Sequence, residues 1–126
     1  MNLRQHFSTS LRSIVLASAV AVAATSAFAH TTLQSASPAI NATVSTQPTK
    51  LLLNFGEPVM LMNIKLVDTQ QKNIDLNYKV TSDLQMAHTV ALPALPDSTY
   101  TVIWTTMGKD GHNMSGKYNF TLKQAQ

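Results

Sequence analysis

The chain has 126 residues, a formal net charge of +3 and no cysteine. Without cysteine it cannot form disulfide bonds, thiolate metal sites, blue-copper electron-transfer sites or cysteine nucleophiles. The nine basic and six acidic residues are scattered, with no basic stripe or acidic tail, so the composition indicates no nucleic-acid partner.

Residues 1–29 have the pattern of a secretory signal peptide. Two arginines give a positively charged start, and the alanine-rich apolar run 14–24 is shorter than the roughly 20 residues of a transmembrane helix. The letters A-F-A at 27–29 fit the small-x-small cleavage pattern. We therefore expect export to the periplasm and one mature domain, residues 30–126, that begins at His30; an uncleaved N-terminal anchor is the alternative.

The mature part has no helical pattern and consists of short alternating segments between turn residues. The expected strands cover residues 30–37, 50–55, 59–69, 74–80, 89–92, 99–107 and 117–122. About seven short strands at near-regular spacing predict an all-β fold, a sandwich or a Greek-key barrel.

Strand phase predicts which side chains form the core. The strongest strand, 99–107, is rich in β-branched residues and places Trp104 on its inward face. In strand 59–69, Met60 and Met62 share a face with later apolar residues, which favours methionine as core filler. The triplet Gly56-Glu57-Pro58 is expected to end the strand before it.

The candidate functional residues lie near the two ends of the mature part. Asp110 and His112 are two positions apart, so on an extended backbone they share a face, and Gly111 between them can adopt a positive φ. After cleavage, His30 carries a free α-amine beside its imidazole, and the two nitrogens can chelate one metal. Three nitrogens and one oxygen suit Cu(II) in tetragonal geometry, although Zn(II) would accept the same atoms in a tetrahedral array.

Several short motifs run through the mature part. They are His30 directly after the A-x-A site, S-P-A at 37–39, L-N-F-G-E-P-V at 53–59, T-Y-T-V-x-W at 99–104, D-G-H at 110–112 and S-G at 115–116. Together they resemble the family of the copper-resistance protein CopC, small periplasmic copper binders. The specific part of the resemblance is the histidine start combined with the Asp-x-His pair.

The resemblance implies a seven-stranded Greek-key β-barrel, described as cupredoxin-like or immunoglobulin-like. It implies Cu(II) bound by the amine and imidazole of His30, by Asp110 and by His112. Glu57 aligns with a glutamate close to the metal in some members and is a candidate outer ligand, with a solvated loop carboxylate as the alternative. The implied function is that of a copper carrier or buffer and not of an enzyme, with an inner-membrane copper transporter or another periplasmic acceptor as partner.

The chain departs from the family pattern at several positions. Asn113 stands where some members have proline, and Lys109 stands where a small polar residue is common. The methionine-rich loop with which some members bind Cu(I) is absent. Met86 with His88 is the only soft ligand pair close in sequence, and Met114 is expected either to line the site entrance or to pack.

Two other functions fit parts of the pattern. A terminal histidine with a second histidine is also the copper site of polysaccharide-cleaving monooxygenases, but this chain is small and its one tryptophan is expected to be buried, so it offers little aromatic substrate face. A structural or adhesion module, in which His30 is accidental, is the other alternative.

Overall fold

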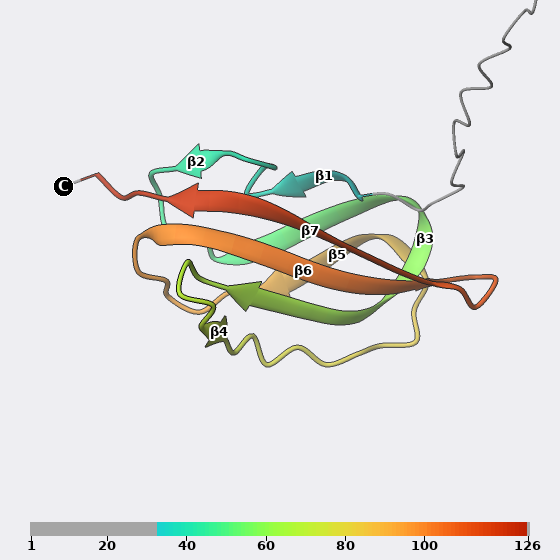
Figure 1. Ribbon diagram of the computed structural model, residues 1–126. Helices are drawn as coiled ribbons and strands as arrows, with labels where there is room; N and C mark the ends of the chain where they lie inside the picture. The colour runs from blue at the N-terminus through green and yellow to red at the C-terminus, as the bar shows by residue number, and fades with distance from the viewer. Residues whose placement is uncertain (1–32, 126) are drawn as a thin grey trace, which may run out of the picture.

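The computed structural model describes residues 33–125, and the leader, His30 and Gln126 lie outside the described part. Its regular structure is entirely β, which confirms the predicted all-β fold (Figure 1). The strands are β1 (Leu33–Ser37), β2 (Thr43–Val44), β3 (Lys50–Val67), β4 (Asn73–Ile74), β5 (Gln85–Ala91), β6 (Ser98–Gly108) and β7 (Asn113–Leu122). Within residues 33–125, no helix is long and apolar enough to cross a membrane.

The strands form one curled sheet in the order β1-β3-β6-β7-β2, and β4 and β5 also pair with β3. The first part of β3 lies between β1 and β5, and its second part pairs with β4 and β6. Figure 1 shows why one strand has four neighbours: β3 runs to one end of the molecule, bends, and returns. The bend brings distant parts of the sequence into one sheet.

The bend of β3 lies at the triplet that was expected to end a strand. The backbone stays extended through Gly56, Glu57 and Pro58, so that prediction was wrong, but the pairing with β5 shifts register between Asn54 and Val59. Proline removes a backbone donor and glycine has no side chain to pack, so a strand can bend here at low cost. The triplet therefore turns the strand and does not end it.

The core confirms the predicted phase of β6 and contradicts the predicted burial of the two methionines in β3. Trp104 is buried on the inward face as expected. In β3 the pairing with β6 shifts register between Leu61 and Asn63. The alternation therefore changes phase there, and odd-numbered residues face the core before the shift but even-numbered residues after it. Met60 and Met62 are therefore only half-buried and lie outside the hydrophobic core, so their prediction as core filler was wrong.

The expected strand 74–80 is mostly irregular. Only Asn73 and Ile74 pair with β3, and Asn77 has a positive φ of 50°, which a regular strand cannot contain. The Asp75 carboxylate accepts a hydrogen bond from the Asn77 backbone N–H at 2.9 Å, a local turn that competes with strand pairing. Tyr78 still packs against the core from this segment.

Candidate metal site

The loop that carries the Asp-x-His pair is a tight hairpin between β6 and β7. The Gly108 N–H donates to the His112 carbonyl and the Gly111 N–H donates to the Gly108 carbonyl, each at 3.0 Å. Gly111 has a φ of +81°, as predicted. This is a turn closed by a left-handed residue, for which glycine is the preferred choice. Asp110 and His112 therefore meet through a turn and not through the alternation of an extended strand.

The structure brings Asp110 and His112 into direct contact. The Asp110 Oδ2 atom lies 2.7 Å from Nδ1 of His112, and its Oδ1 accepts the His112 backbone N–H at 3.1 Å. Both side chains are largely exposed, at 66% for Asp110 and 82% for His112. The hydrogen bond from the His112 backbone N–H, followed by the bond from its ring, lowers the pKa of Asp110 below its ordinary value. The carboxylate is thus ionised at neutral pH.

An ionised Asp110 decides which nitrogen of His112 can bind a metal. The carboxylate only accepts hydrogen bonds, so a neutral His112 ring donates its proton from Nδ1. Its Nε2 then keeps a free lone pair on an exposed ring. A carboxylate behind a histidine is a common way to orient a metal ligand. The hairpin therefore exposes one ring nitrogen, Nε2 of His112, whose lone pair is available to a metal.

Glu57 lies at the same end of the molecule, in the exposed bend of β3. Two residues later, Val59 pairs with Gly108, where the hairpin loop begins. Figure 1 shows the β3 bend and the β6–β7 loop at one end of the sheet. Among residues 33–125, however, no three or more His, Cys, Asp or Glu side chains are grouped closely enough to hold a metal, so Glu57 does not complete such a group with the pair.

The sheet beneath the hairpin is tightly packed. The ring of Trp104 lies against Gly116, where an added Cβ atom would come within 2.3 Å of the indole, and it meets Phe55 edge to face at 5.2 Å. Gly116 thus lets the indole approach the β7 backbone directly. This packing joins the hairpin stem to the bend of β3.

The structure places the candidate Cu(I) ligands Met86, His88 and Met114 in different surroundings. Met86 is half-exposed, whereas His88 is buried and bonds through Nε2 to the carbonyls of Val59 and Gln85. Met114 is partly buried against the core, which supports the packing role. The burial of His88 was not predicted from sequence. The available signal was its position two residues before Val90, which puts both side chains on the same face of the strand.

Comparison with known proteins gives one consistent family. Residues 33–123 match the family described as the CopC domain. The chain is 35% identical over 102 residues to Protein YobA of Escherichia coli K12, covering 78% of this chain and 82% of that protein. It is 33% identical over 108 residues to copper resistance protein C of Escherichia coli, covering 78% and 85%.

Two further similarities place the domain in other contexts. The copper transport protein CutJ of Bacillus subtilis is 28% identical over 102 residues, which cover 78% of this chain but 19% of that protein. The crystal structure of CopC from Methylosinus trichosporium OB3b superposes with a TM-score of 0.67 at 29% identity, covering 77% of this chain and 97% of that one. Fold and sequence agree: this chain belongs to the CopC family of copper-handling proteins, which are not enzymes.

Proposed function

We propose that the protein, processed to begin at His30, is a periplasmic copper(II) carrier or buffer. The observation that supports this most directly is the Asp110–His112 pair, held by a glycine-dependent turn with Nε2 of the imidazole left open. Membership of the CopC family indicates that the metal is copper. We assign the amine and ring of His30, the carboxylate of Asp110 and Nε2 of His112 as ligands, and Glu57 as an outer ligand.

The course of β1 supports the contribution of His30. Leu33, the first described residue, pairs with Phe55 just before the β3 bend. Only two residues lie between His30 and Leu33, so a chain of about 11 Å at most connects their Cα atoms. The segment that leads back to His30 starts at the end of the sheet that carries the hairpin, so His30 can reach the hairpin without a long loop.

In this structure Asp110 lies on the Nδ1 side of the His112 ring, away from Nε2, so it can join Nε2 on one metal only after its bond to the ring opens. A carboxylate has about four lone-pair positions, and His112 takes one on each oxygen. Once the bond to the ring opens, the carboxylate is free to meet the metal that Nε2 binds. With the amine and imidazole of His30, the set is three nitrogens and one oxygen, which Cu(II) binds more tightly than other divalent first-row ions do.

Export and delivery follow from the same proposal. The leader pattern of residues 1–29 directs the chain to the periplasm. A site with exposed ligands and no thiolate exchanges its metal more readily than a closed one, which suits a carrier or buffer. The acceptor we propose is an inner-membrane copper transporter or another periplasmic copper protein; the match to a segment of a copper transport protein supports the former.

The test is a copper(II) titration of protein that begins at His30, followed by electron paramagnetic resonance. We expect one tight equivalent with a tetragonal spectrum and nitrogen hyperfine structure. Absence of a tight equivalent would contradict the proposal. A spectrum without nitrogen couplings would contradict the ligand assignment.

A further inference from the structure

Strand β5 has a hydrogen-bonded neighbour on one side only. It pairs with β3, and among the strands of residues 33–125 none pairs with its other edge. The shorter strands leave little edge to pair with, because β2 and β4 have two residues each and β1 is interrupted by a register shift. In β5, residues 87–91 (A-H-T-V-A) pair with β3 in unbroken register and include no proline, lysine, arginine or acidic residue. This edge therefore lacks the features with which proteins prevent further strand pairing.

The register shows which backbone groups of β5 face outward. Just beyond the strand, the Leu92 N–H donates to the Thr49 carbonyl at 2.9 Å, so these two residues form a hydrogen-bonded pair of the antiparallel ladder. Such pairs alternate with non-hydrogen-bonded ones, so the backbone groups of Val90 and His88 also face β3. The N–H and C=O groups that point away from β3 belong to the intervening residues, Ala87, Thr89 and Ala91.

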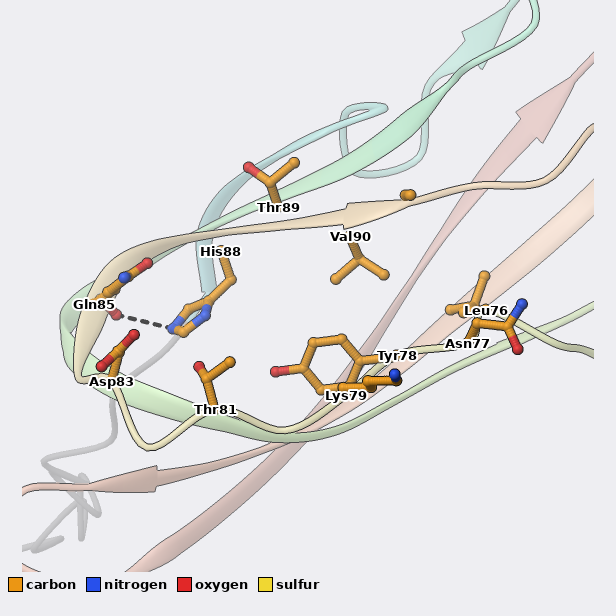
Figure 2. A pocket seen from close by; sticks show the side chains of 11 residues that line it. Leu76, Asn77, Tyr78, Lys79, Thr81, Asp83, Gln85, His88, Thr89 and Val90 are labelled. Atoms are coloured by element: carbon orange, nitrogen blue, oxygen red, sulfur yellow. Dashed lines mark hydrogen bonds between the residues drawn. The ribbon is translucent and has the colours of Figure 1, made fainter.

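A groove of about 360 Å³ lies along this free edge. Its lining alternates between inward-facing and outward-facing residues of β5, so the edge of the strand itself borders the groove; these residues are His88, Thr89, Val90 and Ala91. The opposite wall is the irregular segment 76–83, and Figure 2 shows Thr81 and the ring of Tyr78 between that segment and β5. The copper ligands proposed above do not line this groove.

His88 offers the groove a hydrogen-bond acceptor. The residue is only 7% exposed, and its Nε2 atom lies 2.8 Å from the Val59 carbonyl oxygen and 3.1 Å from that of Gln85. Carbonyl oxygens only accept hydrogen bonds, so Nε2 carries the proton and Nδ1 of the neutral ring keeps its lone pair. Figure 2 shows Nδ1 turned toward Thr81 and Tyr78, into the groove. A buried acceptor gains from a hydrogen bond that an incoming donor supplies.

The surroundings of the groove are apolar and carry no net charge. Three exposed apolar side chains lie next to lining residues in the chain: Val80 at 53%, Leu84 at 43% and Met86 at 50% exposure. The charged residues of the lining are Lys79 and Asp83, whose charges are opposite. The groove therefore suits an uncharged segment better than an acidic or a basic one.

We propose that the groove binds an extended, uncharged segment of another protein, which adds to β5 as an antiparallel strand. Main-chain hydrogen bonds to the outward groups of β5 supply affinity, and alternate side chains supply specificity. In the added strand, the residue opposite His88 faces inward beside Nδ1, so a serine or threonine there donates to it. The residue opposite Val90 comes two positions earlier and is apolar. A second copy of β5 fits less well, because it would bring its own segment 76–83 and its own β3 to the same edge.

Amide hydrogen exchange of the processed, copper-free protein tests this with the blocked hexapeptide T-V-T-T-Q-V as probe. Its second residue is placed opposite Val90 and its fourth opposite His88. Saturable binding should slow exchange of the outward N–H groups of Ala87, Thr89 and Ala91, and should change those of His88 and Val90 little. A control peptide with valine as fourth residue keeps the shape but loses the donor to Nδ1, so it should bind about fivefold more weakly, the worth of one net hydrogen bond.

The protein variant is Thr89→Pro, which removes an N–H that points away from β3 and leaves the existing ladder intact. It should abolish peptide binding, whereas the matched control Thr89→Val keeps the N–H and should bind as the parent does. A peptide N-methylated at its third residue, opposite Thr89, makes the same test on the unaltered protein and should also fail to bind.

Three results would overturn the proposal. The first is the absence of saturable protection at the outward N–H groups. The second is equal binding of the N-methylated and unmodified peptides. The third is protection that rises with protein concentration without any peptide, which would assign the edge to a second copy of this chain. Because the protein is free of copper throughout, none of these results depends on the hairpin site.

Discussion

Asp110 does two things for His112. It accepts the ring N–H, which fixes the tautomer, and it accepts the backbone N–H, which fixes the turn. Both effects require the ionised carboxylate, whose pKa these bonds lower. A substitution of Asp110 therefore affects both the tautomer of His112 and the turn that holds it.

The first prediction concerns the two hairpin ligands. His112→Ala and Asp110→Ala should each weaken Cu(II) binding about 10–100-fold or more, because each removes a proposed ligand and Asp110→Ala also frees the His112 ring. Met60→Ala is the control, since Met60 is half-buried and outside the core. Competition with a coloured chelator measures all three. Equal affinities would contradict the site assignment.

The second prediction concerns pH in the metal-free protein. Because the folded-state pKa of Asp110 is lowered, its contact with His112 is fully present above the ordinary aspartate pKa of 3.8. Any stability that it contributes is lost as the pH falls through the lower, folded-state value. The carboxyl carbon signal of Asp110 should therefore titrate with a midpoint below 3.8. A midpoint at or above that value would show that the contact does not persist in solution.

At the scale of elements, the stem of the hairpin is packed closely against β3. Gly116 accepts the indole of Trp104, and Trp104 meets Phe55 in β3. The loop base is joined to the same strand, because Val59 pairs with Gly108. The hairpin and the β3 bend therefore form one unit.

The third prediction tests that unit. Gly116→Ala should lower the free energy of unfolding by about 1–3 kcal/mol, because the added Cβ would lie within 2.3 Å of the Trp104 ring and overpack the stem. Ser115→Ala, at the exposed neighbouring position, should change it little. Chemical denaturation measures both. Equal stabilities would mean that the ring moves aside without cost.

Sequence patterns predicted elements well where the backbone is regular and poorly where it bends. The alternation around Trp104 is regular, and its burial was predicted correctly. The phase of Met60 and Met62 was wrong, since a register shift is set by pairing with another strand and leaves no local signature. Likewise, a turn at Asn77 interrupts the expected strand 74–80, and the alternating pattern of that segment gives no sign of the turn.

At the scale of the whole molecule, the bend of β3 brings three separate segments to one end of the sheet. It places Glu57, the hairpin and the start of β1 at one end of the sheet, although they are far apart in sequence (Figure 1). The Asp-x-His pair and its glycine could be predicted from sequence because they are local. The convergence of three segments could not, because it depends on one strand reversing direction within a continuous ladder.

The central claim is that processing makes the site. The α-amine of His30 is a ligand only when it is free, whereas in a longer chain the same nitrogen is a weakly basic peptide amide. A free α-amine ordinarily has a pKa near 7.7–8.0, so metal binding must displace a proton from it. Affinity should consequently fall as pH drops, because protons compete with the metal for the nitrogen ligands.

The most direct measurement compares two proteins, one beginning at His30 and one with a single extra residue before it. Competition with a coloured chelator at fixed pH gives both Cu(II) affinities. We predict that the protein beginning at His30 binds Cu(II) orders of magnitude more tightly, with Asp110 and His112 present in both. Equal affinities would show that the amine is not a ligand and that cleavage has no part in forming the copper site.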